Sequence, residues 1–184
     1  MIADKLKLHL GNYVKITRTV AQGVDEASSG YILNFSDNLI LLHEAGDFTL
    51  QGYSVIPVKQ VKKIRHNKFD KCFKQIMIAE GEADKVGISY KIDLSSWQSV
   101  FKSIQATRLN AIVEVEDPAD IIFSIGPILK ITTKKVHIEY FDAEGFISDN
   151  PDKIDFEDIT KVKFDDRYIN VFSKYLRKKK AKKE

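Results

Sequence analysis

Residue types that could do acid–base, nucleophilic or metal chemistry are scattered along this sequence. The four histidines lie far apart, and the single cysteine has no Cys or His partners at metal-site spacing. The sequence contains no glycine-rich phosphate loop and no His-Glu-x-x-His, paired Cys-x-x-Cys or Gly-x-Ser-x-Gly element. It therefore predicts a protein that is not an enzyme and has no metal or other cofactor. The residues concerned are His9, His43, His66, His137 and Cys72.

Three alternatives stay open within this scattered set. Glu114, Glu116, Asp117 and Asp120 could bind a cation if the fold brought them together, although carboxylates on a solvated strand face are the commoner arrangement. An enzyme would need a pocket that unites distant carboxylates or histidines. Cys72 cannot form an internal disulfide, and we expect a buried structural thiol there.

The charged residues that could contact a partner have opposite signs in the two halves of the sequence. We hypothesise that a basic stretch of the first half faces an acidic stretch of the second half, in the same chain or in a neighbouring molecule, because complementary charges set orientation and steer encounter. The alternative is that both stretches are solvated faces. The candidate contacts for nucleic acid or a partner are Lys59, Lys62, Lys63, Arg65 and Lys68, and the acidic residues are Asp155, Glu157, Asp158, Asp165 and Asp166.

Composition limits the class of protein. The chain of 184 residues is 43% hydrophobic, which is enough for a core in one medium or two small domains. No apolar run approaches the roughly 18 to 20 residues of a membrane-spanning helix, and the N-terminus lacks a signal-peptide layout, so we expect a cytoplasmic protein. Residues 1–83 carry 11 basic and 9 acidic side chains, residues 84–176 carry 12 and 16, and residues 177–184 carry 6 and 1. The net charge of +3 therefore comes mostly from the tail, which we expect to be disordered.

The elements that would position these residues are duplicated. Apolar positions recur about 99 residues apart, first in a strand, then in a β-hairpin, and then in a strand, a tight turn and a short strand. We therefore expect the same small α+β unit to be built twice. The matching segments are Leu10–Ile16 with Leu109–Val115, Gly30–Glu44 with Gly126–Tyr140, and Val55–Ile64 with Lys153–Val162.

Helices are expected to flank both copies. An aromatic-bearing stripe with helical spacing ends each copy at a constant offset of 99 residues and predicts a helix docked on the sheet. A further helix is predicted between the copies, capped by Ser95 or Ser96 with Gln98 as capping-box partner. The N-terminal segment fits a helix or a strand, and an extra strand is expected around Val86–Ile92. The stripes are Phe69, Cys72, Phe73, Ile76 and Met77, then Tyr168, Val171, Phe172, Tyr175 and Leu176, and the stripe of the middle helix is Trp97, Val100, Phe101 and Ile104.

Each copy resembles the Sm-like (LSm) small barrel, within the wider group of SH3-like barrels. The resemblance rests on a helix followed by five short strands, on a glycine that opens the second strand, and on the hairpin Gly-x-Ile-x-x-Phe followed by x-Leu-Ile-Leu. It implies two tandem five-stranded barrels, self-association by pairing of the fourth and fifth strands of neighbouring units, and in many members RNA binding. The diagnostic RNA-binding residues are not matched. Asp37 and Asn38 lie together in the turn, and no Arg-Gly follows Val61 or Ile159.

These observations predict a mainly-β α+β protein with four segments. Residues 1–79 form the first unit, 80–93 a linker, 94–176 the second unit and 177–184 the basic tail. We expect a non-catalytic binding or assembly protein of unknown ligand, which self-associates through barrel edges as a compact pseudo-dimer or a larger ring. The alternative is an RNA-binding protein that uses the basic residues 59–68 and the tail.

Overall fold

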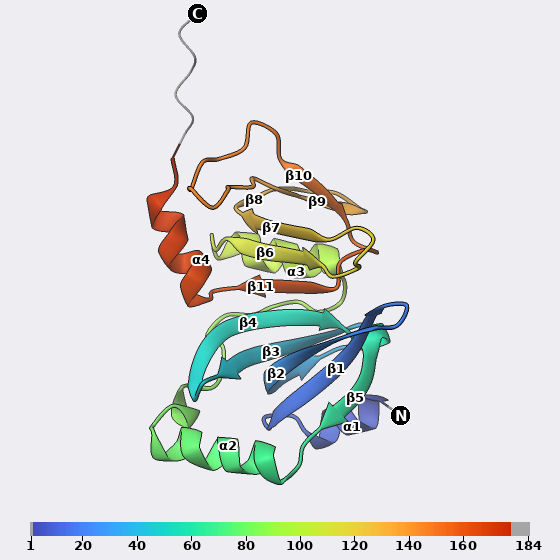
Figure 1. Cartoon of the computed structure of the whole chain (residues 1–184), viewed down its shortest axis with the longest axis vertical. Coiled ribbons are helices and arrows are strands. Elements are labelled where there is room, and N and C mark those ends of the chain that lie inside the picture. The colour runs from blue at the N-terminus through green and yellow to red at the C-terminus, as the bar shows by residue number, and fades with distance from the viewer. Residues whose placement is uncertain (1, 178–184) are drawn as a thin grey trace, which may run out of the picture.

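The computed structural model describes residues 2–177 and is mainly β (Figure 1). The expected disordered tail, apart from Arg177, lies outside the described residues. The first half contains α1 (Ile2–Leu8), β1 (Tyr13–Ala21), β2 (Val24–Phe35), β3 (Leu39–Gly46), β4 (Thr49–Pro57), the 3-10 turn η1 (Val58–Gln60), β5 (Val61–Arg65), α2 (Lys68–Ala79) and η2 (Ala83–Lys85). The second half contains α3 (Trp97–Ala106), β6 (Ala111–Val115), β7 (Ile122–Gly126), β8 (Ile128–Ile131), β9 (Lys135–Ile138), β10 (Asp152–Asp155), β11 (Lys161–Phe164), α4 (Arg167–Phe172) and η3 (Ser173–Tyr175).

The strands form two antiparallel sheets. Eight strands follow the order β5-β1-β2-β3-β4-β11-β6-β7, and three follow the order β10-β9-β8. Because only Pro127 separates β7 from β8, the second half repeats the strand order of the first half, with one break. The expectation of two five-stranded barrels is thus met in part: the mainly-β fold and the strand order are present, but neither set of five strands closes on itself in the described chain.

The hairpins of the two halves are equivalent residue by residue. A bulge separates Ile32 from Asn34 where β2 pairs with β3, and an equivalent bulge lies 96 residues later between Ile128 and Lys130. In the turn, the Ser36 hydroxyl accepts hydrogen bonds from two backbone N–H groups, and the Thr132 hydroxyl does the same in the second half. The expected duplication is therefore present in the pairing itself.

The first strand of each half matches at a different offset from the one predicted. Val14 lies opposite Gly30, and Ala111 lies opposite Gly126, so equivalent residues are 97 rather than 99 positions apart. The alignment of Val14 with Val113 was wrong by two residues. A shift of two keeps every side chain on its original face, so the hydrophobic pattern cannot detect it.

Both halves contain a glycine where β2 or its equivalent crosses closely over the next strand. A Cβ atom on Gly30 would lie 2.3 Å from the His43 carbonyl oxygen, and one on Gly126 would lie 2.0 Å from the Glu139 carbonyl oxygen. Gly126 also has a φ of +156°, a conformation open mainly to glycine. These glycines allow the strands to bend tightly over the core.

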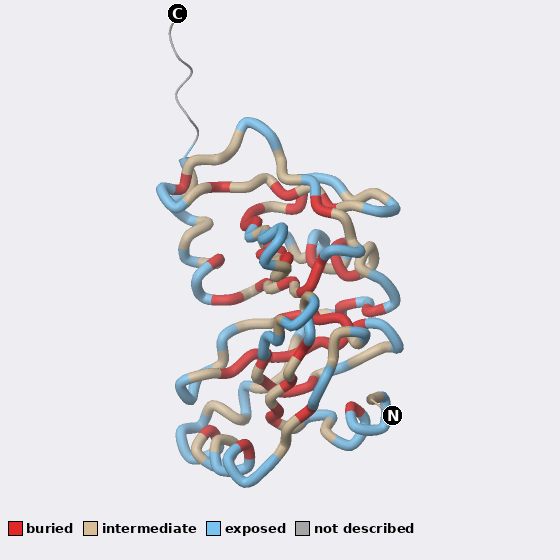
Figure 2. Tube along the Cα trace, turned by 45° about the vertical axis from the view of Figure 1, so that its right-hand side comes forward, coloured by how far each residue is buried: buried red, intermediate tan, exposed pale blue. Residues whose placement is uncertain are grey.

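The two halves share a hydrophobic core. They are joined by antiparallel pairing of β4 with β11, where Val55 lies opposite Val162. Leu39 and Leu41 of the first half belong to the same buried cluster as Val113 of the second half, and the buried parts of the trace run through both halves (Figure 2). Every residue of Leu39–Ala45 is buried, as expected for a strand covered on both faces.

The segment between the halves is irregular and packs against them. The extra strand predicted around Val86–Ile92 is not formed. Instead, Ile92 and Leu94 are buried in the shared core, and the Tyr53 hydroxyl donates a hydrogen bond to the Gly87 carbonyl. The segment therefore covers the junction through side-chain contacts and not through the backbone hydrogen bonds of a strand.

The helices agree with the predictions in part. The N-terminal segment is a helix, and Val100, Phe101 and Ile104 of α3 are buried as predicted. Ser96 rather than Ser95 caps α3, so Gln98 is not at the capping-box position, and its side chain donates to the Thr132 carbonyl. No helix of residues 2–177 is long and apolar enough to cross a membrane.

The predicted stripes on α2 and α4 are only half used for packing. Met77 of α2 is buried, but Phe69 and Cys72 are exposed, so the expectation of a buried thiol was wrong. In α4, Ile169 is buried while Tyr168 and Val171 are exposed. The packed face is centred one residue further along than the predicted stripe, because both helices lie at the edge of the sheet and turn one side to the surface.

Candidate functional site

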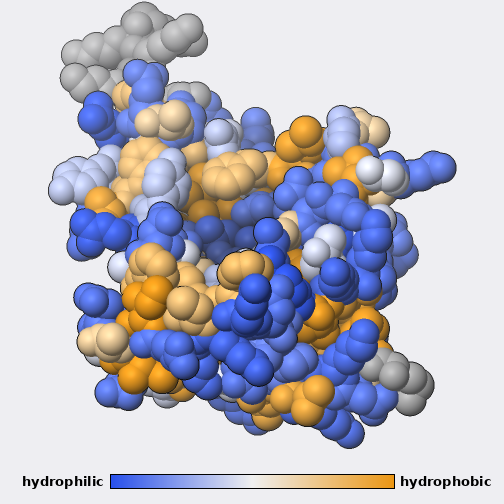
Figure 3. Space-filling model, turned by 60° about the horizontal axis from the view of Figure 1, so that its bottom comes forward, coloured by the Kyte–Doolittle hydropathy of each residue, from blue (hydrophilic) through white to orange (hydrophobic). Residues whose placement is uncertain are grey.

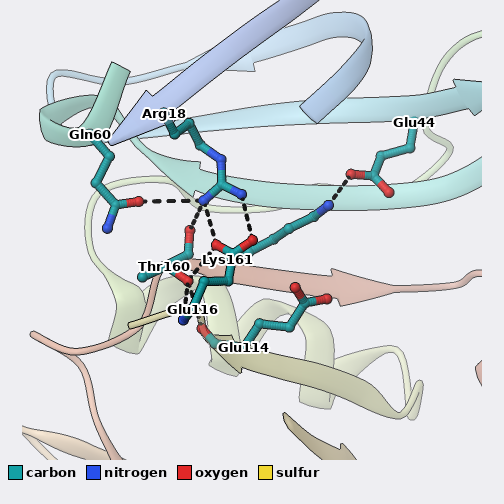
Figure 4. Close-up of polar contacts among 7 residues, drawn as sticks. All are labelled: Arg18, Glu44, Gln60, Glu114, Glu116, Thr160 and Lys161. Carbon is teal, nitrogen blue, oxygen red and sulfur yellow. Dashed lines mark hydrogen bonds and ion pairs between the residues drawn. The ribbon is translucent and has the colours of Figure 1, made fainter. Parts of the chain in front are cut away.

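A buried arginine joins the two halves. Arg18 of β1 is fully buried and points into the seam between the halves (Figure 4). Its Nη1 donates to Oε2 of Glu116 at 2.8 Å and to the Thr160 carbonyl at 2.9 Å, and its Nη2 donates to Oε1 of Glu116 at 2.9 Å. A bidentate ion pair of this kind fixes the relative orientation of the guanidinium and the carboxylate. The pair therefore locks β1 of the first half to the end of β6 in the second.

In a second set of ion pairs across the seam, the first half supplies the anion and the second half supplies the cations. Glu44 of β3 lies 2.7 Å from Nζ of Lys161 and 3.6 Å from Nζ of Lys163, both on β11 (Figure 4 shows the Lys161 contact). Lys163 also contacts Asp166, whose side chain caps α4. Each half thus supplies a cation and an anion to the seam, so the contact is specific in orientation.

The seam shifts the pKa values of its carboxylates in different directions. Burial acts to raise the pKa of Glu116, but hydrogen bonds from Arg18 and Thr160 outweigh it and leave the pKa below its usual value. Burial likewise opposes the charge on Glu44, but Lys161 and Lys163 bring its pKa below the usual value. Burial raises the pKa of Glu114, which Lys161 offsets only in part. These groups form ion pairs and hydrogen bonds across the junction between the halves.

Replacing Glu114 with glutamine is expected to increase the free energy of unfolding at neutral pH. The raised pKa means that the charged carboxylate is less stable in the folded state than in the unfolded state. At pH values above the ordinary pKa of 4.5, this charge therefore lowers the free energy of unfolding of the wild type. That effect disappears as the pH falls through the folded pKa. Urea unfolding of both proteins at several pH values should show the difference at pH 7 and its loss in acid; a difference independent of pH would contradict this account.

The residues predicted to contact a partner lie on or beside the outer strand of the first half, except Lys59, which lies next to the second half. Lys62, Lys63 and Arg65 are on β5, the last strand at one end of the eight-stranded sheet. Lys59 is in η1, and Lys68 begins α2. The acidic stretch of the second half lies around β10 and β11. Glu157 and Asp158 line the same cavity as Lys59, so the structure brings part of the two stretches together within the chain.

Within one molecule the two stretches meet at this cavity, but no ion pair among the described residues joins them. Lys62 pairs with Asp25, and Arg65 pairs with Asp70, both in the first half. Asp155 pairs with Lys135 in the second half. The ion pairs that cross the seam involve other residues, because the strand of the second half that meets the first half is β11, and it pairs with β4. Contact with a neighbouring molecule stays a prediction.

Within the described part of the chain, the other candidate groups are not placed to hold a metal ion together. Glu116 of the acidic cluster is used by Arg18, and within residues 2–177 no three His, Cys, Asp or Glu side chains are placed to hold a metal ion. His9 and His66 do come together, with ring centroids 4.9 Å apart. His66 Nδ1 lies 2.8 Å from the Tyr13 carbonyl, which gives this histidine a structural contact.

Comparison with known proteins identifies no relative. No family model matches the chain, and no curated protein or solved structure matches it either. The geometry of the chain is therefore the basis for a functional proposal.

Arg18 and Glu44 of the seam were missed by the sequence reasoning, although a signal was present, whereas Glu114 and Glu116 were named only as possible cation ligands. Val14 and Ile16 face the core, and the next position on that face is Arg18. Glu44 similarly lies within the apolar run of β3. A charged residue at a core-facing position needs a buried partner, so these two could have been singled out as contacts between elements.

Proposed function

We propose that this protein is a non-catalytic assembly protein built from two Sm-like units, which associates with further copies of itself through its outer strands. The observation that carries the proposal is the pairing of β4 with β11, which joins the fourth strand of one half to the fifth strand of the other. The equivalent strands β10 and β5 have no partner on their outer edges among the described residues. Unpaired strand edges tend to pair with another chain.

The internal junction predicts the register of the contact between chains. Ser54 lies opposite Lys163, and the equivalent residues 98 positions away are Asp152 of β10 and Arg65 of β5. In the same register, Asp155 lies opposite Lys62. Opposite charges thus face each other at two positions of the proposed pairing, which favours this register over a slipped one.

Light scattering on wild-type protein over a wide range of concentration tests the proposal. We expect the mass to rise above that of one chain. Lys62→Glu is expected to raise the dissociation constant about tenfold, because it places two acids opposite each other at about 1.4 kcal/mol per contact. The double variant Lys62→Glu with Asp155→Lys should recover association, because the charges are again opposite.

Lys91→Glu is the matched control, since Lys91 is exposed in the irregular segment away from both edges. It should associate like the wild type. A mass of one chain at every concentration, or equal association of wild type and Lys62→Glu, would exclude the proposed pairing.

A further inference from the structure

A groove lies between helix α4 and the beginning of strand β4. Its volume is about 630 Å³, within the range of roughly 300 to 1000 Å³ that is usual for ligand sites. The walls are Thr49, Leu50 and Gln51 on one side and Tyr168, Val171 and Tyr175 on the other. Figure 3 shows hydrophobic side chains gathered at the left of the view.

The β4 wall of the groove is an unpaired strand edge. β11 pairs with β4 only at Tyr53–Val55. At Gly52 the chain that follows β11 still lies close to β4, since a Cβ there would lie 2.6 Å from the Asp165 carbonyl oxygen. The chain then continues into α4 and leaves Thr49–Gln51 uncovered by a strand. No strand of the described chain pairs with Thr49–Gly52 on this edge. The backbone groups of Thr49–Gln51 that point away from β3 are therefore placed to bond to an added strand.

The α4 wall consists of residues of the predicted aromatic stripe that do not pack against the sheet. Tyr168 is 57% exposed and Tyr175 is 64% exposed, with Val171 between them at 42%. Ile169 and Phe172 make the packing contacts of this helix instead. An apolar face beside an open strand edge has the features of a peptide-binding groove, in which backbone bonds give affinity and side-chain pockets give specificity.

The charges of the groove indicate the chemistry of its occupant. Lys163 and Asp166 pair with each other, so they cancel. Arg167 is exposed, and no ion pair within residues 2–177 uses it. A carboxylate would complement this remaining positive charge.

We propose that the groove binds an extended peptide that adds a strand to β4 in line with β11, with apolar side chains against Tyr168 and Val171 and an acidic residue near Arg167. The added strand continues a ladder that the chain already builds at Tyr53–Val55. This site does not depend on the self-association proposed above, because β5 and β10 form no part of it.

Selection from a phage-displayed library of random peptides on the full chain tests the site. We expect enriched peptides that alternate apolar residues and include a carboxylate. A synthetic peptide of the enriched sequence should shift the backbone amide resonances of Thr49–Gly52 in NMR spectra. A proline in the middle of that peptide should remove most of the binding, because it takes away a ladder donor.

Two variants and two matched controls locate the binding. Val171→Asp and Arg167→Glu should each weaken the selected peptide about tenfold or more. Leu129→Asp and Lys102→Glu change an exposed apolar and an exposed basic residue elsewhere and should leave affinity unchanged. Absence of any enriched peptide, amide shifts confined to other strands, or unchanged affinity in Val171→Asp would overturn the proposal. A fall in self-association in Val171→Asp would also overturn it, because a second copy would then be the occupant.

Discussion

Replacing Glu116 with alanine is expected to lower the free energy of unfolding by about 3 to 5 kcal/mol, because it leaves the guanidinium of Arg18 buried without its carboxylate. Arg18 is 0% exposed, and both of its Nη atoms donate hydrogen bonds to the carboxylate of Glu116. Its remaining partners, the Thr160 carbonyl and Gln60, are uncharged and cannot balance the charge. Urea unfolding followed by circular dichroism measures the change.

Two comparisons show whether the buried charge is the cause. Glu157→Ala removes an exposed glutamate of the same half and should change the free energy of unfolding by less than about 0.5 kcal/mol. Arg18→Met combined with Glu116→Leu removes both charges and should recover most of the loss, since apolar replacements of buried pairs are often neutral or stabilising. If the double variant is as unstable as Glu116→Ala, the loss has another origin.

Replacing Gly126 with alanine is expected to lower the free energy of unfolding by about 3 kcal/mol or more. The new methyl group would lie 2.0 Å from the Glu139 carbonyl oxygen, a distance that requires the backbone of two strands to move apart. Overpacking of this kind costs about 1 to 3 kcal/mol, and the φ of +156° adds strain of about 1 to 3 kcal/mol. Chemical unfolding gives the magnitude.

Gly23→Ala shows how much of the loss at Gly126 comes from the close contact and how much comes from the backbone conformation. Gly23 also has a positive φ, of +76°, but no heavy atom lies within 4 Å of a Cβ placed there. This variant should lose only about 1 kcal/mol. Equal losses at the two positions would mean that the contact with Glu139 does not matter.

Much of the local structure could be predicted because neighbouring residues encode it. The hairpins of both halves, their side-chain-capped turns and the buried face of α3 follow from alternation, turn residues and helical spacing. The failures have a common physical origin. The two-residue slip of the first strand leaves all faces unchanged, and the stripes on α2 and α4 do not show which side of a helix meets a sheet.

The candidate site was predictable only in part for a related reason. The sequence indicates that Lys62 and Asp155 belong to stretches of opposite charge, but each of them forms an ion pair within its own half. Arg18 and Glu116 are 98 positions apart in the chain, and no local pattern pairs them. Their contact exists because β4 pairs with β11 and places the ends of β1 and β6 against one seam.

The sequence by itself therefore determines that one unit is built twice, with which strands and with which inward faces, because these depend on interactions between near neighbours. Only the tertiary structure decides how the two units meet, which charges become buried between them, and which strand edges and helix faces stay open. Those features depend on contacts between residues far apart in the chain, where many pairings share the same hydrophobic pattern and packing selects one of them.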